Sequence, residues 1–530
     1  MLINGCFGLR RQTILIATLI FLVLMTVLLQ NHRVPYVPKL KKPSFRAPPP
    51  KPADRIVPEP ASHDDLSRFH LLLPASNPDV NLCKTLLTAS VLGYPVPTLM
   101  SWNETYNNDT LIDGGRHFSK ISAVNRWLDN QPGWRDNDLV LVMDAYGGFN
   151  QHASTPEELA AYRDGDAWFQ LPLEVLIERF HAVNKKANQD LAKRLGNAFG
   201  SETIRQNVIF GAGKRCTPSN VSSAACYPVP DSPLPKDMYG PETEAYPHLN
   251  YTMERQRYLS SNFIMGSVLH MRRLFNRANQ RIKNVTVDDP AIMKGSDQAI
   301  FQRIFGEQEY QREVMRRKYG GGPRDPVWIE GVQIKNSLDP LFPHDELKQY
   351  DHKTNDYGIG IDYYADLGQQ ITDDSEDDAQ WLIYRRNIDQ QLLGKPRQTT
   401  SCTPQVSGLL PLEILNATAL PRAAVSDASQ FSPLHGWDEI PLYTNICLDT
   451  IPAIVTHSGN QKERERDWPE MWLQPHGRRL IDEILARGEE EIGTRGGAWT
   501  HKNRYLSWGE LCPIGVEREL YRDYWDPEEN

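Results

Sequence analysis

Two long apolar runs end in side chains that can bind a hard metal ion. Residues 139–148 read LVLVMDAYGG and reach the carboxylate of Asp144, and residues 451–460 read IPAIVTHSGN and reach the imidazole of His457. Each run is apolar over the length of a buried strand. Because ligands bind beyond the carboxyl ends of the strands in an open α/β sheet, we expect both side chains at the same edge of one sheet. Together they would hold Mn²⁺ or Mg²⁺ against a diphosphate.

Each of these two residues also has a purely structural interpretation. An aspartate followed closely by glycines often begins a turn. A histidine at the end of an apolar run is often a hydrogen-bonded core residue. The neighbouring motifs, described next, favour the metal-ligand interpretation of both residues.

A glycine pair precedes a basic helix start in residues 113–128, DGGRHFSKISAVNRWL. Gly114 and Gly115 leave backbone N–H groups open to an anion, and Lys120 follows within the first helical turns. Backbone donors and a lysine at a helix start are suited to a phosphate or a ribose. This segment is therefore a candidate nucleotide-binding element.

Two more motifs lie between the apolar runs. Residues 258–266, YLSSNFIMG, form a strand-like run that leads into an arginine-rich helix. Residues 295–306, GSDQAIFQRIFG, place Asp297 and Gln298 at the opening of a helix.

The elements around these motifs alternate between strands and helices. Strand patterns begin near residue 69 and recur at 95–100, 139–143 and 207–213, with helical patterns at 82–91, 118–128 and 172–195 between them. Alternation of this kind predicts βαβ units and an α/β fold with a mainly parallel sheet.

The order of these motifs resembles the glycosyltransferase domain of the procollagen lysyl hydroxylases and, more loosely, the collagen galactosyltransferases. That family has a glycine cluster with a lysine, a strand ending in Asp-x-x-Asp, a Tyr-Leu-Asn-Ser-Gly-like run, an acidic cluster ending in Asp-Gln, and a strand ending in His-Gly-Asn-Gly. The resemblance covers residues 69–472. It implies a GT-A-type, Rossmann-like fold and transfer of a hexose from a UDP-sugar to a lumenal protein or glycan acceptor.

The resemblance also assigns roles to residues. Asp144 and His457 become metal ligands, and Asp297 lies near the acceptor or the transferring sugar, as the catalytic candidate. The residues that it places around the donor are Gly114, Gly115, Lys120, Tyr146, Ser260, Ser261, Asn262, Gln298, Gly459, Asn460 and Lys462. Asp362 and Asp366 lie in a run that resembles the family's strand and following segment, ahead of the strand that ends in the metal-binding histidine. We interpret Asp362 as part of an ordinary half-buried strand.

The chain departs from the family pattern at two places. Gly147 stands where the family has its second metal aspartate, and the acidic cluster is reduced to Asp297 behind Gly295 and Ser296. No iron-binding His-x-Asp with a distal His follows in this sequence, so we do not expect lysyl hydroxylase activity. The departures favour an alternative from another class, a catalytically silent scaffold that binds a sugar nucleotide or a glycan. A lumenal glycoside hydrolase with two carboxylates is a further alternative, but it would leave the histidine without a role.

The amino-terminal region predicts a type II membrane protein. Residues 1–12 form a cytosolic tail, 13–29 an uncharged signal anchor, 30–66 a proline-rich stem, and 67–530 one lumenal domain. Seventeen residues span roughly 25 Å, enough for a thin bilayer. No small-residue cleavage site follows the apolar segment, which favours an uncleaved anchor.

Sequons and cysteines indicate a lumenal body in the endoplasmic reticulum or Golgi. Six Asn-x-Ser/Thr frames follow the anchor, at Asn103, Asn108, Asn220, Asn250, Asn284 and Asn416. Six of the seven cysteines also follow the anchor, an even number that permits three disulfides. We expect Cys216 to pair with Cys226, while buried free thiols stay an alternative for the other four. The net charge of −9 gives no sign of nucleic-acid binding.

Overall fold

The computed structural model describes most of the chain after residue 57. The described residues are 58–62, 65–66, 68–104, 118–130, 135–144, 166–217, 221–240, 243–245, 251–283, 296–329, 331–335, 338, 356–371, 376–393, 402–418, 420, 436–457, 465–487 and 496–523. They belong to one compact unit, Pro49–Asn530. Within them no helix has the length and apolar character to cross a bilayer, and the predicted anchor at 13–29 lies outside them.

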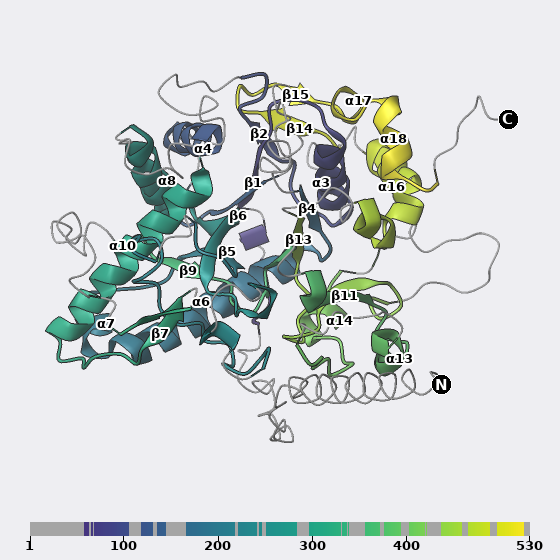
Figure 1. Cartoon of the computed structure of the whole chain (residues 1–530). Coiled ribbons are helices and arrows are strands. Elements are labelled where there is room, and N and C mark those ends of the chain that lie inside the picture. The colour runs from purple at the N-terminus through teal and green to yellow at the C-terminus, as the bar shows by residue number, and fades with distance from the viewer. Residues whose placement is uncertain are drawn as a thin grey trace, which may run out of the picture. The chain divides into compact units, whose positions relative to one another are not determined.

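A mixed eight-stranded sheet forms the centre of this unit, in the order β15-β14-β2-β1-β3-β6-β5-β9 (Figure 1). Its strands are β1 (Phe69–Pro74), β2 (Thr98–Met100), β3 (Leu139–Met143), β5 (Val208–Gly213), β6 (Tyr258–Ser267), β9 (Ile359–Ile361), β14 (Ala498–Thr500) and β15 (Tyr505–Leu506). The pairs β14–β2, β2–β1, β1–β3 and β5–β9 are parallel, while β6 runs antiparallel to β3 and β5. The predicted α/β class with a mainly parallel sheet is confirmed.

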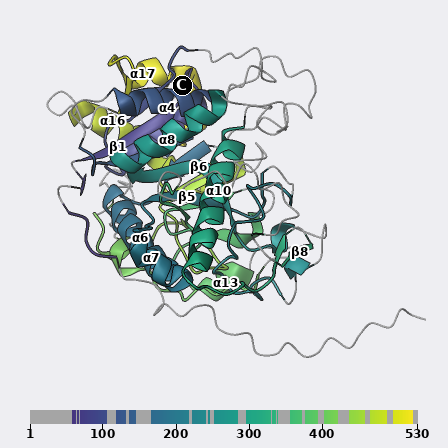
Figure 2. The same cartoon turned by 90° about the vertical axis from the view of Figure 1, so that its left-hand side faces the viewer.

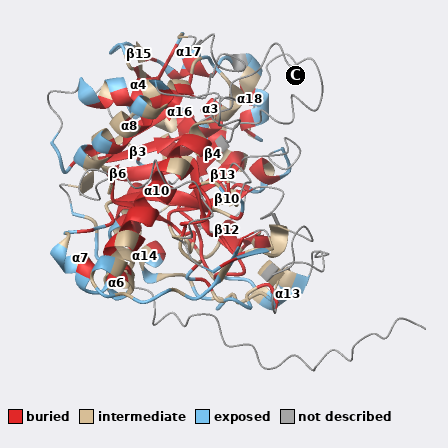
Figure 3. Ribbon diagram, turned by 60° about the vertical axis from the view of Figure 1, so that its left-hand side comes forward, coloured by how far each residue is buried: buried red, intermediate tan, exposed pale blue. Residues whose placement is uncertain are grey.

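The two faces of the sheet carry separate apolar cores. In β1, Leu71 and Leu73 belong to one core and Leu72 to the other, because successive strand side chains point to opposite faces. The first core includes α3 (Val80–Val91) and α6 (Leu173–Leu195). The second includes α4 (Phe118–Asp129), α8 (Val268–Lys283) and α10 (Asp297–Lys318). Figure 2 shows α4, α8 and α10 together over one face, and Figure 3 shows the sheet as the most buried layer.

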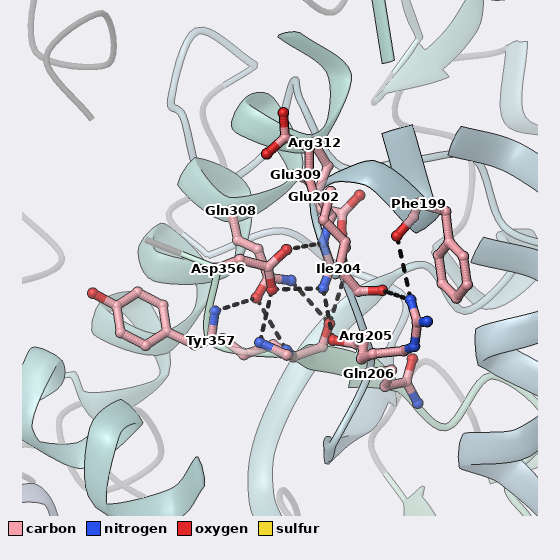
Figure 4. Close-up of polar contacts among 12 residues, drawn as sticks. Phe199, Glu202, Ile204, Arg205, Gln206, Gln308, Glu309, Arg312, Asp356 and Tyr357 are labelled. Atoms are coloured by element: carbon pink, nitrogen blue, oxygen red, sulfur yellow. Dashed lines mark hydrogen bonds and ion pairs between the residues drawn. The ribbon is translucent and has the colours of Figure 1, made fainter. Parts of the chain in front are cut away.

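Helix α10 fixes the edge of the sheet with a buried amide. The side chain of Gln308, labelled in Figure 4, donates to the Ile359 carbonyl (2.9 Å) and accepts from the Ile359 N–H (3.0 Å) in the edge strand β9. An open strand edge invites pairing with another chain, so this contact blocks that edge at Ile359. Beside it, Arg312 binds the carboxylates of Glu309 and Asp356.

The start of α10 is fixed by its sequence. Ser296 caps the helix, accepting a hydrogen bond of 3.2 Å from the Ala299 N–H. Asp297 then stands in the first turn and Arg316, Arg317 and Lys318 in the last, which matches the charges to the helix dipole. The predicted helix opening at Asp297 and Gln298 is confirmed.

A second, three-stranded sheet follows β9. The chain turns between Asp362 and Gly368 and enters the sheet β10-β13-β4, built from β10 (Gly368–Ile371), β13 (Ile454–His457) and β4 (Asp166–Phe169). Strand β13 is parallel to β10 and antiparallel to β4. Two antiparallel pairs stand apart from these sheets, β11 (Ala379–Leu382) with β12 (Leu442–Asn445), and β7 (Val327–Ile329) with β8 (Val332–Ile334).

The remaining elements are short helices and one C-terminal helix of moderate length. They are α7 (Asn197–Ser201), η3 (Thr243–Ala245), η4 (Tyr251–Met253), η5 (Glu376–Asp378), α13 (Ile388–Leu393), α14 (Leu412–Leu415), η7 (Trp468–Glu470), η8 (Gln474–His476), α16 (Gly477–Arg487), α17 (Trp508–Leu511) and α18 (Ile514–Leu520).

The six cysteines of the body form three disulfides. Cys216 pairs with Cys226 as predicted, and Cys83 pairs with Cys512 and Cys402 with Cys447, with Cα atoms 5.7–5.8 Å apart. The other four cysteines are therefore disulfide-bonded, and the alternative of buried free thiols is wrong. Cys83 lies in α3, and its partner follows α17 near the other end of the described chain.

Candidate functional site

Charged residues gather where the parallel strands of the main sheet end. Strands β1, β3, β5 and β9 run in the same direction, since β6 is antiparallel to both β3 and β5. Their carboxyl ends therefore share one edge. Asp144 follows β3, Lys214 follows β5 and Asp362 follows β9 directly. In α/β proteins this edge is where ligands bind.

One lysine joins two of the predicted site carboxylates. The Nζ of Lys120 lies 2.9 Å from Oδ1 of Asp144 and 3.0 Å from Oδ2 of Asp297. The same ammonium donates to Oδ2 of Asp144 (3.1 Å) and to the carbonyl of Ser261 (2.6 Å). Helix α4, the residue after strand β3, strand β6 and helix α10 each supply one of these groups. Four motifs identified in distant parts of the sequence thus meet at one point.

The electrostatics of this cluster are set by burial and by charge number. The side chain of Lys120 is 6% exposed, against 24% for Asp144 and 15% for Asp297. Burial alone would lower the pKa of Lys120, but the two carboxylates outweigh burial and raise this pKa above its usual value. The three side chains together sum to one negative charge, and only the carboxylates have appreciable contact with solvent.

Strand β6 forms the wall beside the cluster. The backbone of Ser261 is held on both sides, because its N–H donates to Oε1 of Gln298 (2.6 Å) and its carbonyl accepts from Lys120. The Gln298 amide nitrogen donates to the Leu259 carbonyl. Gln298, predicted to bind substrate, thus holds the strand backbone in this structure.

The two other predicted residues of β6 are Ser260 and Asn262. The buried hydroxyl of Ser260 has no hydrogen-bond partner within the part of the chain that the structure describes. The Asn262 carbonyl accepts from the Asp144 N–H (3.0 Å), which fixes the backbone of the aspartate.

The expectation that Asp144 and His457 end strands of one sheet is wrong. His457 ends β13, the middle strand of the three-stranded sheet, whereas Asp144 follows β3 of the main sheet. A continuous apolar run indicates a buried strand but carries no information about its partner strands. The two sheets meet through Asn262, whose side-chain nitrogen donates to the Thr456 hydroxyl at 3.4 Å.

His457 is a buried residue in this arrangement. Its ring is tilted 41° against Trp168, with the ring centroids 4.3 Å apart. Trp168 in turn lies edge-on to Trp468, and Lys84 lies over both indole rings. The imidazole is therefore held by an aromatic wall on at least one side.

Asp362 is not the half-buried strand residue predicted from the sequence. It is fully buried just past β9 and accepts backbone N–H groups from Asp366 (3.0 Å), Leu367 (2.8 Å) and Gly368 (3.0 Å). Burial, together with the Asp366 carboxylate, raises the pKa of Asp362 to about 7 despite these three donors. Asp362 thus forms the turn that leads from the main sheet into the second sheet.

Sequence reasoning missed a second buried ion pair at the same edge. Lys214 lies 2.7 Å from Asp378, and both side chains are buried. The Tyr239 hydroxyl donates to the same carboxylate (2.9 Å), and Lys214 donates to the Thr252 carbonyl (2.7 Å). The one sequence signal was a lysine directly after the apolar run 207–213. This pair ties the end of β5 to η5, ahead of β11.

Several predicted site residues lie outside the described residues. These are Gly114, Gly115, Tyr146, Gly459, Asn460 and Lys462, together with Gly147. Their assignments stay predictions.

The donors that the structure describes suit a hard divalent ion in type. The Lys120 ammonium already has an all-oxygen environment of two carboxylates and one carbonyl, the ligand type that Mg²⁺ and Mn²⁺ prefer. Asp144 fits as a ligand because part of its carboxylate meets solvent. Among the described residues no group of three or more His, Cys, Asp and Glu side chains is placed to hold a metal. The metal therefore stays a prediction.

Comparison with known proteins adds no relative. No family model matches the chain, and no curated protein matches it.

Proposed function

We propose that this chain is a metal-dependent glycosyltransferase that moves a hexose from a UDP-sugar to a lumenal protein or glycan acceptor. The observation that carries the proposal is the shared ammonium of Lys120, which joins Asp144 and Asp297 beside strand β6. These residues come from three separate motifs, and they stand at the edge of an α/β sheet where nucleotides bind.

The residues take distinct roles in this proposal. Asp144 would hold Mn²⁺ or Mg²⁺, with His457 as the second ligand, and the ion supplies positive charge next to the leaving diphosphate. Lys120 adds a fixed positive charge at the same place. Asp297, with a partly exposed carboxylate, orients the acceptor hydroxyl or accepts its proton. The Ser260 hydroxyl and the Asn262 side chain face the donor sugar.

The proposal includes a membrane-anchored, lumenal location in the Golgi or endoplasmic reticulum. Three disulfides support it, because disulfides persist in oxidising compartments. The sequons at Asn103 and Asn416 support it as well, since both asparagines are exposed.

The test is hydrolysis and transfer of the sugar of UDP-hexoses by the detergent-solubilised full chain, with Mn²⁺ and with EDTA. We expect slow UDP release with Mn²⁺ that EDTA abolishes. Asp144→Asn should remove the activity, whereas Asp190→Asn on the exposed face of α6 should not. UDP release that proceeds equally in EDTA contradicts the metal dependence.

A second candidate function is a silent scaffold that binds a sugar nucleotide or a glycan without transfer. The observation in its favour is that Lys120 already neutralises much of the charge on Asp144 and Asp297, as in a structural ion pair. UDP binding without any release of sugar would select this function.

A further inference from the structure

We infer that Lys120 acts as a tethered competitor of the divalent ion, so that the ion binds well only together with a nucleotide diphosphate. The inference rests on the proposed function and deepens it. It concerns a positioning role for Lys120, and it makes metal and nucleotide binding mutually dependent.

The geometry supplies the first step. Four oxygen atoms lie within 3.1 Å of the Lys120 Nζ, two from Asp144, one from Asp297 and one from the Ser261 carbonyl. Both carboxylate oxygens of Asp144 are thus already within hydrogen-bond distance of a cation. A metal ion that binds Asp144 must share or take over at least one of these oxygens, and in either case it comes close to the ammonium.

Burial supplies the second step. The ammonium group of Lys120 lies in the interior, at the amino-terminal end of α4, and it cannot swing out to water without losing all three partners. An incoming divalent ion therefore meets a fixed positive charge a few ångströms away. Like charges at this distance disfavour binding strongly when they are shielded from water.

Charge number supplies the third step. The cluster of Lys120, Asp144 and Asp297 has one net negative charge, which is too little to compensate a divalent ion. A diphosphate supplies the missing negative charge, and it gives the ammonium a new partner. Metal and diphosphate then each raise the affinity for the other by the same factor.

The test is calorimetric titration of the full chain with MnCl₂, with and without UDP. In Lys120→Met the Mn²⁺ affinity without UDP should rise at least about tenfold, within the range typical of changes to groups around a metal site. The factor by which UDP improves Mn²⁺ binding should shrink correspondingly. Lys193→Met, which removes an exposed lysine of α6, should leave both quantities as in the wild type.

A double variant distinguishes the effect of the ammonium beside Asp144 from the effect of the net charge of the cluster. Lys120→Met combined with Asp297→Asn has the same cluster charge as the wild type but leaves Asp144 without its ammonium. We expect Mn²⁺ to bind this variant more tightly than the wild type, and to raise its melting temperature more. The melting measurement applies even where Lys120→Met is unstable.

The results distinguish the two proposals. Mn²⁺ affinity that is unchanged or weaker in both Lys120 variants overturns the inference, as does a lack of Mn²⁺ binding to all of them. The proposed function fails separately, if the wild-type chain binds no UDP and releases none from UDP-hexoses. A wild type that binds UDP and Mn²⁺ together, beside Lys120 variants with unchanged Mn²⁺ affinity, would leave the function standing and the inference refuted.

Discussion

The side chain of Asn262 donates a hydrogen bond of 3.4 Å to the hydroxyl of Thr456, and this contact joins the two sheets of the protein. Asn262 also accepts the Asp144 N–H through its carbonyl, and Thr456 directly precedes His457. Asn262 therefore contacts both the backbone of Asp144 and the residue before His457, the two predicted metal ligands.

That relationship predicts a shared dependence of nucleotide binding on Asp144 and His457. Asp144→Asn and His457→Ala should each abolish the mutual enhancement of UDP and Mn²⁺ affinity, because each removes one ligand of the same ion. Calorimetry of UDP with and without Mn²⁺ measures it. His181→Ala, an exposed histidine of α6, serves as the control. Retained enhancement in His457→Ala would exclude His457 as a ligand.

The Lys214–Asp378 ion pair predicts a large effect on stability. Removing one partner leaves an uncompensated buried charge, so Lys214→Met should lower the free energy of unfolding by about 3–5 kcal/mol. Chemical denaturation measures this, with the exposed Lys193→Met expected within about 0.5 kcal/mol of the wild type. Replacing both partners, Lys214→Met with Asp378→Leu, should recover part of the loss. A small effect of Lys214→Met alone would mean that water reaches the pair.

Asp362 predicts a specific pH dependence. Its pKa in the folded protein is raised to about 7, whereas the ordinary value is 3.8. The folded state therefore binds more protons than the unfolded state between these values, and the contribution of this group to stability falls as pH rises from about 4 to 7. In Asp362→Asn the melting temperature should change less with pH between about pH 4 and 7 than it does in the wild type. An unchanged slope in that variant would show that Asp362 is ionised throughout.

The edge of β9 predicts a local change in hydrogen exchange. Gln308→Ala leaves the Ile359 N–H and carbonyl without their side-chain partner and should cost about 1–3 kcal/mol, the range for an unsatisfied buried group. Exchange of the Ile359 amide, followed by mass spectrometry, should quicken in this variant while that of β3 stays slow. Gln390→Ala, in the exposed helix α13, provides the comparison. Equal acceleration throughout the sheet would indicate global destabilisation instead.

The exposed asparagine Asn416 predicts the topology of the chain. Asn416 follows α14 at the surface, so a lumenal body should carry a glycan there. Asn416→Gln and Thr418→Ala should each remove one endoglycosidase-sensitive increment of mass. The carboxyl end should resist protease in intact vesicles. Digestion of that end in unbroken vesicles would reverse the orientation.

Local patterns were sufficient to predict most elements of the main sheet. The apolar run at 139–143 and the capped start of α10 each specify their element through neighbouring residues, so both were predictable. The order of motifs placed Lys120, Asp144 and Asp297 around one site, but the ion pairs between them were not predicted, since contact between distant segments is a property of the whole fold. The separate sheet of His457 could not be predicted, because an apolar strand has no signal for its partners. A lone lysine after a strand likewise did not reveal the Lys214–Asp378 pair.

The placement of β14 beside β2, and of Cys512 beside Cys83, has a consequence for biosynthesis. The two cysteines are separated by 429 residues. At roughly 5–20 residues per second, synthesis of that interval takes about 20–90 s. During this time the edge of β2 and the thiol of Cys83 have no native partner, so they are exposed to chaperones and to disulfide exchange. The main sheet is thus completed only after the ribosome has made β14, β15 and Cys512, and we expect folding of the body to finish no earlier than that.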